Sequence, residues 1–157
     1  EALLANSVEL ADITDLAVTN AKLATPARRT IIPIPIDDLT NLTNVGEDVV
    51  TDIVPGFAGT IESIFYIGGT IATSAGAATM ALHVEIGATP ITGGVLTIDE
   101  ASIVTPAALG VYVAGTPITA LNVFTNVDTL SLVNAAGGTV FTAGAGVVIL
   151  VCSVEGQ

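Results

Sequence analysis

The chain has 157 residues, of which 51% are hydrophobic and 4% aromatic, and its formal net charge at pH 7 is -12. This length suits one domain with a hydrophobic core and is too short for two ordinary domains. The longest unbroken apolar runs, such as VVILVC at residues 147–152, fall far short of the roughly 20 residues of a membrane-spanning helix. We therefore expect one domain with appendages, no transmembrane helix and no visible signal peptide. The single cysteine, Cys152, excludes an intramolecular disulfide framework and is expected to be a buried thiol.

The basic residues all lie near the N-terminus. Lys22, Arg28 and Arg29 are the three Lys and Arg residues of the chain, whereas its 15 Asp and Glu residues are spread along the whole length. From residue 30 onward there is no Lys or Arg, so that part should form no ion pair of its own with either residue. Because it is acidic, it should be repelled by DNA, RNA and anionic membranes. The two parts are therefore expected to have different partners.

A short degenerate repeat occupies the N-terminal segment. LANSVELAD (residues 4–12) and LAVTNAKLAT (residues 16–25) align with one inserted residue, and each carries Leu-Ala near both ends. Neither copy has enough aliphatic side chains to build a core, yet the segment is too apolar for a solvated linker. We interpret residues 1–30 as an extended arm that docks on a partner and residues 31–157 as the folded body. The alternative is a flexible leader.

The body is expected to begin with an edge strand in TIIPIPIDDL, residues 30–39. Pro33 and Pro35 leave one edge of this strand without N–H donors, while the isoleucines at every second position share one face. This pattern predicts an edge strand whose isoleucine face packs inward. The Asp37–Asp38 pair that follows is typical of a turn; the alternative is part of a divalent-cation site.

From Gly46 onward the pattern is that of an all-β domain, in which β-branched and aliphatic segments alternate with Gly-, Pro- and Asn-rich breaks. In TMALHVEI (residues 79–86) apolar and polar side chains alternate, as in a strand with one buried face. Further strands are expected at residues 59–68, 111–115, 128–135 and 146–154, with loops at residues 68–78 and 143–146. Roughly eight strands predict a two-sheet antiparallel β-sandwich, with a jelly roll as the first choice.

The last expected strand, GVVILVCSV at residues 146–154, is apolar on both faces. A strand with one exposed face would alternate, so this one is either central in a thick sandwich or covered by another subunit. Charged residues are also scarce between residues 68 and 82. Self-association of the chain is the simplest explanation of both features.

Patterns for catalysis and metal binding are weak. The single histidine, His83, shares a strand face with Glu85, which is the pattern of an ordinary surface pair. The sequence has no His/Cys cluster with zinc spacing, no phosphate-binding loop ending in Lys-Ser/Thr and no dinucleotide-binding fingerprint. Acidic pairs such as Asp99–Glu100 occur, but the chain has no Trp and few aromatic residues to line a sugar groove. We expect no enzymatic activity, no cofactor and no metal site.

The unit AVTNAKLA, residues 17–24, resembles the short AVT-x-AKLA repeats of bacteriophage fibre and head-decoration proteins, which are often homotrimers. The body pattern over residues 49–98 similarly resembles phage virion proteins of the head-fibre or capsid-decoration kind. The resemblance implies a homotrimeric capsid decoration (cement) or head-fibre protein on the capsid surface of the virion, with the major capsid protein as partner. On this interpretation, these residues of the arm contact the capsid: Leu16, Val18, Lys22, Leu23, Arg28 and Arg29. The alternative is a tail-fibre or tailspike module that recognises host surface glycans through the loops of the sandwich.

Overall fold

The computed structural model describes residues 28–41, 46, 48–74, 78–99, 112–137 and 141–154. Within these residues almost all regular structure is β. The elements, in chain order, are β1 (Arg29–Ile36), the 3-10 helix η4 (Leu39–Asn41), β2 (Asp48–Ile53), β3 (Gly59–Ser74), β4 (Thr79–Ile86), β5 (Thr89–Pro90), β6 (Leu96–Asp99), β7 (Tyr112–Ala114), β8 (Val123–Phe124), β9 (Leu130–Gly137) and β10 (Phe141–Val154). The predicted arm lies outside the described residues, apart from its last three.

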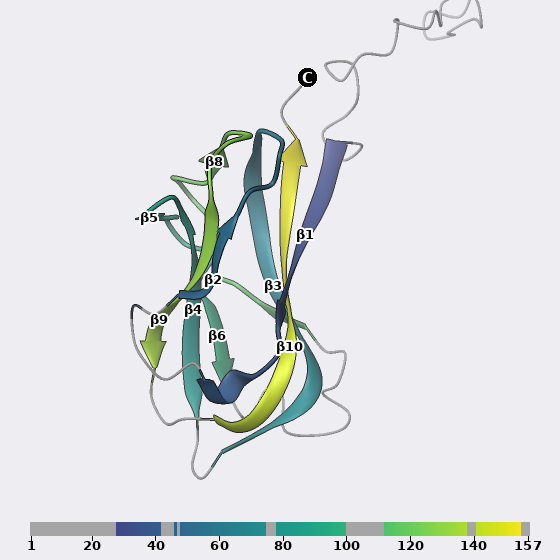
Figure 1. Cartoon of the computed structure of the whole chain (residues 1–157), viewed down its shortest axis with the longest axis vertical. Coiled ribbons are helices and arrows are strands. Elements are labelled where there is room, and N and C mark those ends of the chain that lie inside the picture. The colour runs from purple at the N-terminus through teal and green to yellow at the C-terminus, as the bar shows by residue number, and fades with distance from the viewer. Residues whose placement is uncertain are drawn as a thin grey trace, which may run out of the picture.

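Two antiparallel sheets pack face to face (Figure 1). Sheet A has the order β1-β10-β3-β7, with β8 also paired to β3, and sheet B has the order β2-β9-β4-β5, with β6 also paired to β4. The first strand thus lies beside the last strand in one sheet, and the second strand lies beside the last but one in the other. This interleaved order is that of a jelly roll. The predicted all-β antiparallel sandwich is confirmed.

The core is an aliphatic layer between the two sheets, and strand periodicity selects its members. In β1 the buried and exposed positions alternate, so that Ile32, Ile34 and Ile36 face sheet B. In β4 the alternate residues Met80, Leu82 and Val84 are buried in the same way. Both predicted strands are confirmed, and β1 is an edge strand as expected.

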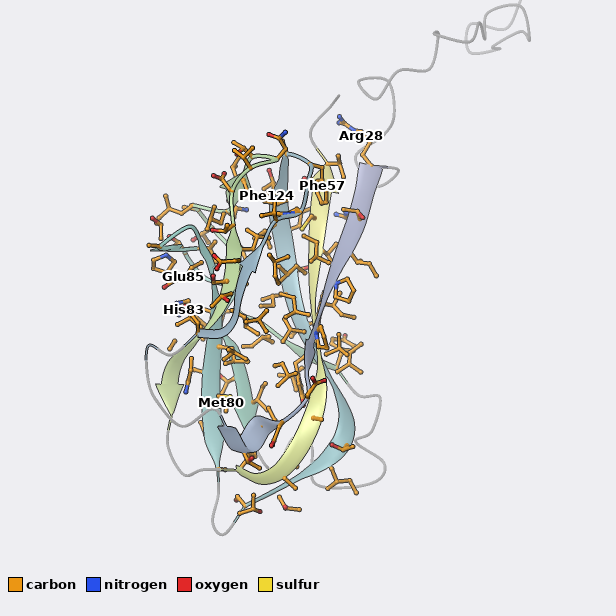
Figure 2. The ribbon with its side chains drawn as sticks, viewed as in Figure 1. Arg28, Phe57, Met80, His83, Glu85 and Phe124 are labelled. Carbon is orange, nitrogen blue, oxygen red and sulfur yellow. The ribbon has the colours of Figure 1, made fainter. Side chains whose placement is uncertain are left out.

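One end of the core is closed by aromatic packing. Phe57 and Phe124 meet edge to face with ring centroids 5.5 Å apart, near the end of the sandwich where β1 begins and β10 ends (Figure 2). Arg29 pairs with Ser153 in the register of these two strands. The chain therefore enters the body and leaves β10 at the same end.

Two segments predicted as loops are largely strand. Residues 68–74 continue β3, and residues 141–146 begin β10. The register shifts several times where these segments pair, and Gly144 adopts a left-handed backbone conformation with a φ of 135°. The hydrogen bonds of a strand pair join backbone groups, so segments with small side chains can form them. The small side chains also leave room for the bulges. The loop predictions for residues 68–74 and 143–146 are therefore wrong, and β2 and β6 were not predicted.

Candidate interaction surface

The side of sheet A that faces away from sheet B is apolar over its middle rows. Residues directly opposite each other in an antiparallel pair project to the same side, so the register assigns the outward side chains in rows across the sheet. The three rows are Ile31–Val151–Ser63, Pro33–Ile149–Phe65–Ala114 and Pro35–Val147–Ile67–Tyr112. We call these residues the outer face of sheet A. None of them is charged.

This face explains why β10 is apolar on both sides. Its inward residues Val148, Leu150 and Cys152 are fully buried against sheet B. Its outward residues are half-buried by their neighbours in β1 and β3, and nothing in the described part of the chain covers them. The strand has a neighbour on each side within its sheet, but the sandwich covers only one of its two apolar faces, so the alternative of a strand central in a thick sandwich does not describe it.

A hollow of about 300 Å³ lies in the outer face of sheet A, and its lining is Phe65, Ile67, Tyr112 and Ile149. The rings of Phe65 and Tyr112 pack edge to face, with centroids 5.5 Å apart and an interplanar angle of 86°. Tyr112 is nevertheless 63% exposed. An aromatic pair with this much solvent-exposed apolar area is typical of a surface that contacts a partner.

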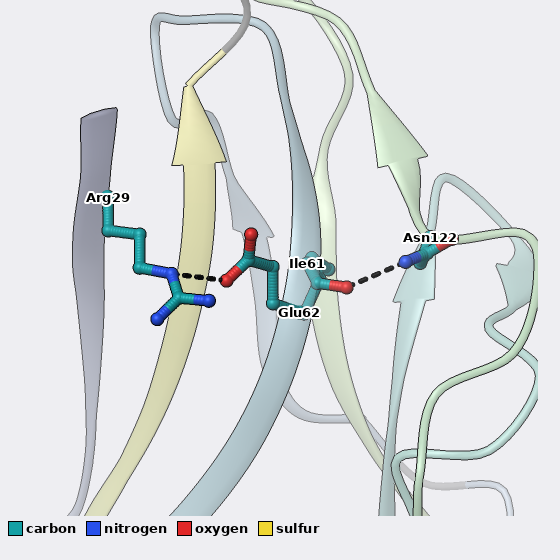
Figure 3. Close-up of polar contacts among 4 residues, drawn as sticks. All are labelled: Arg29, Ile61, Glu62 and Asn122. Carbon is teal, nitrogen blue, oxygen red and sulfur yellow. Dashed lines mark hydrogen bonds and ion pairs between the residues drawn. The ribbon is translucent and has the colours of Figure 1, made fainter. Parts of the chain in front are cut away.

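An ion pair borders this face at the end where β1 begins. The Nε atom of Arg29 lies 2.6 Å from Oε2 of Glu62, and the contact crosses over β10 (Figure 3). Glu62 is the extra residue of a bulge in β3, because Ser63 pairs with Val151 while Ile61 pairs with Cys152. This pair joins Arg29, the last basic residue of the predicted arm, to a carboxylate of the acidic body, because strand pairing already begins at Arg29.

The predicted capsid-contacting residues are only partly visible in the structure. Arg28 lies half-buried just before β1 (Figure 2), and Arg29 is the first residue of that strand and pairs with Glu62. The other members of the predicted set lie outside the described residues: Leu16, Val18, Lys22 and Leu23. Of the predicted set, the described residues include only Arg28 and Arg29, which are adjacent at the start of β1.

The opposite side of the sandwich carries the His83–Glu85 pair. His83 Nε2 lies 3.1 Å from Glu85 Oε1, and both half-buried side chains point away from sheet A (Figure 2). The predicted same-face pair is confirmed. No group of three His, Cys, Asp or Glu side chains that would suit a metal ion occurs among the described residues.

The acidic pair after β1 forms a turn. The Oδ1 atom of Asp38 accepts a hydrogen bond of 2.8 Å from the backbone N–H of Thr40, at the start of η4. This bond lowers the pKa of Asp38 below its usual value of 3.8. The favoured interpretation of this pair as a turn is confirmed.

Two titratable groups lie in the core. Burial raises the pKa of the Tyr66 hydroxyl to about 12, and burial together with the negative charge of Glu62 raises the pKa of the Cys152 thiol to about 12. A nucleophilic cysteine needs a lowered pKa and an accessible sulfur atom, and Cys152 has neither. It is the buried thiol that the sequence predicted.

Sequence reasoning missed the residues that make the outer face most distinctive. Phe65, Ile67 and Tyr112 belong to the segments IFYI and VYV, in which apolar residues occupy both strand faces. Consecutive apolar residues predict a strand with two apolar faces. We drew this conclusion from the sequence only for β10, although β3 and β7 show the same pattern.

No family model matches the chain, and neither a curated protein nor a solved structure is significantly similar to it. No helix in the described part of the chain is long and apolar enough to span a membrane. Fold and surface together define a jelly-roll domain that presents an uncharged apolar sheet face.

Proposed function

We propose that the chain is a structural virion protein that binds the outer surface of a phage capsid as a homotrimer and decorates or stabilises the head. The observation that carries the proposal is the outer face of sheet A. This face offers an apolar surface for contact with another protein, and none of its residues is charged. The resemblance of AVTNAKLA to head-decoration and fibre repeats supplies the capsid as the partner. The proposed role is binding, without a catalysed reaction.

Charge supports self-association through this face. Each copy carries a formal net charge of -12, so copies repel one another wherever their acidic side chains meet. The outer face of sheet A contains no Asp or Glu, and the charged residues at its border, Arg29 and Glu62, are paired with each other. Contact through this face therefore buries apolar side chains without bringing carboxylates together. Each large side chain that becomes fully buried contributes about 1.5 to 3 kcal/mol.

The direction of the chain supports docking by the arm. β1 begins at the end of the sandwich where β10 ends, so residues before Arg28 join the body at that end. An arm bound to the capsid would place this end near the capsid and the far end of the sandwich in solvent. Lys22 and Arg28 then pair with acidic groups of the capsid, whereas Arg29 already pairs with Glu62 within the body.

The test uses particles that lack this protein and full-length variants added to them. Replacing Leu16, Val18 and Leu23 together with Ser should lower occupancy by speeding release, because it removes buried apolar contacts. Replacing Lys22 and Arg28 with Gln should slow capture and reduce its salt dependence, because peripheral charges steer encounter. Replacing Arg29 with Gln is the matched control and should leave capture nearly unchanged.

Occupancy is measured by sedimentation at two salt concentrations, and imaging locates the protein on the particle. If both multiple variants decorate heads as well as the parent, the arm is a leader and the proposed anchoring is wrong. If the protein is found on the tail, capsid decoration is wrong and the glycan-binding tail module takes its place.

A further inference from the structure

We infer that copies of the chain contact one another through two different parts of the outer face of sheet A: the β1 edge of one copy packs into the hollow of the next. This inference rests on the proposed homotrimer and specifies its interface. We call Ile31, Pro33 and Pro35 the β1 ridge. The hollow is the one lined by Phe65, Ile67, Tyr112 and Ile149.

The ridge and the hollow are neighbouring parts of one sheet face, and they adjoin where Ile149, which lines the hollow, pairs with Pro33 of the ridge. Sheet A has the order β1-β10-β3-β7, so the ridge occupies one edge, and the Phe65–Tyr112 pair occupies the other. All three ridge residues are exposed, and Ile31 is 59% exposed although it is a large aliphatic side chain. The hollow of about 300 Å³ is about twice the roughly 150 Å³ that admits a benzene-sized group. It is therefore large enough for a ridge side chain.

A ridge and a hollow on one sheet face can meet in two arrangements. In a two-fold dimer the contact is isologous, so that the ridge of each copy packs into the hollow of the other. In a closed ring the contact is heterologous, so that each copy packs its ridge into one neighbour and receives the ridge of the other, and the proposed homotrimer requires this second arrangement. A ridge and a hollow on the same face are different and complementary patches. Three copies, each turned by one third of a circle, use both patches of every copy.

The β1 edge itself argues for packing by side chains and not by strand addition. An exposed edge strand usually invites pairing through its free N–H and C=O groups. Pro33 and Pro35 lack N–H groups, so the edge of β1 offers few donors to a second sheet. Contact between copies therefore involves the faces of the sheets.

The charge of the face favours another copy as the partner. Four strands about 4.8 Å apart and three rows about 6.6 Å apart cover roughly 400 Å², within the range of the largest apolar patch of a typical monomer, which is often functional. A second copy is a partner that presents the matching ridge and hollow in the same molecule. Like-charged copies also require an interface without carboxylates, and this face meets that requirement.

The first experiment adds one charge to the face. Ile31→Glu and Tyr112→Glu should each convert the trimer to monomers, because a carboxylate would be buried in an apolar contact. Leu121→Glu is the matched control, since Leu121 is 61% exposed but lies in a loop outside the outer face of sheet A. Light scattering measures the mass, and circular dichroism verifies that each variant retains its β structure. Trimers that persist in both face variants would overturn the inference.

The second experiment tests which patches meet. Within one copy Ile31 and Tyr112 are three strands and two rows apart, roughly 20 Å, which a short bis-maleimide does not span. A variant with both Ile31→Cys and Tyr112→Cys should therefore be cross-linked between copies into covalent trimers. Each single variant should stay uncross-linked, and Cys152 is buried and should not react.

The outcomes separate this inference from the proposed function. If the parent is a trimer and the double variant is not cross-linked, the trimer uses another surface and only the inference fails. Covalent dimers of the double variant in place of trimers would show two-fold packing of ridge and hollow, and dimers formed by Ile31→Cys alone would show that two ridges meet; either result would also overturn it. A monomeric parent would overturn the inference and the proposed homotrimer together.

Discussion

Replacing Tyr66 with Phe should make the protein more resistant to alkali without a loss of stability at neutral pH. Tyr66 is fully buried in the core, and its hydroxyl has no hydrogen-bond partner among the described residues. Burial disfavours the charged phenolate and raises the pKa of Tyr66 from 10.0 to about 12. Phe keeps the ring and removes only the hydroxyl.

The magnitude follows from proton linkage. Between pH 10 and about 12 the unfolded chain loses the phenolic proton while the folded chain retains it. The free energy of unfolding therefore falls by about 1.4 kcal/mol per pH unit in this window, or about 3 kcal/mol across it. This is a large part of the roughly 5 to 15 kcal/mol that stabilises an ordinary domain. At neutral pH the variant should be as stable as the parent or more stable, because a buried hydroxyl without a partner is unfavourable.

The assay compares urea unfolding of the parent and the Tyr66→Phe variant at neutral pH and near pH 11, following circular dichroism. The chain has two tyrosines and no tryptophan, so tyrosinate absorbance reports ionisation without interference from tryptophan. Tyr112→Phe is the matched control, since Tyr112 is exposed. Cys152 contributes to alkaline sensitivity in all three proteins. If Tyr66→Phe loses stability in alkali as steeply as the parent, the reasoning from burial is refuted.

Three further predictions concern stability. Gly146→Ala should lower the free energy of unfolding by about 1 to 3 kcal/mol in urea, because its Cβ would lie 2.5 Å from the carbonyl oxygen of Ile67 and from the ring of Tyr66; Gly69→Ala, whose Cβ has no neighbour closer than 3.6 Å, should change it little. Asp38→Ala should lower the melting temperature at neutral pH but not in strong acid. The lowered pKa of Asp38 means that its contribution is present above pH 3.8 and is lost as pH falls through the folded value; Asp37→Ala is the control, and an equal loss at all pH values would contradict the assignment to this carboxylate. Breaking the Arg29–Glu62 pair with Arg29→Gln should cost only about 0.2 to 1 kcal/mol in thermal unfolding, since Arg29 is 51% exposed, and a larger loss would mean that the pair does more than bridge two strands.

The sequence alone determined the strands whose side chains alternate. Apolar residues at every second position identified β1 and β4, because successive side chains of a strand point to opposite faces whatever the partner strand is. The prolines identified β1 as an edge strand for an equally local reason, since a residue without an N–H group cannot donate to a neighbour. Cys152 was placed in the core because its neighbours are aliphatic.

The ends of β3 and β10 were beyond the reach of this reasoning. Residues 68–74 and 141–146 contain several Gly residues, which favour turns, and few large apolar side chains that could show an alternating pattern. They are strands because each supplies backbone partners to the other, a pairing between segments far apart in the chain. The composition of a segment is a local property, whereas the presence of a second strand to pair with depends on residues far away in the chain.

Only the tertiary structure assembled the outer face of sheet A. The sequence showed that β10 is apolar on both sides, but it did not show which strands flank it. The jelly-roll order places Ile31, Phe65 and Tyr112 on the same side of one sheet, although they come from three distant segments. The Arg29–Glu62 pair arises in the same way, because a bulge at Glu62 turns this side chain toward β1. Side-chain direction is fixed by each strand's own backbone, but side-chain neighbours are fixed by strand order and register, which long-range pairing decides.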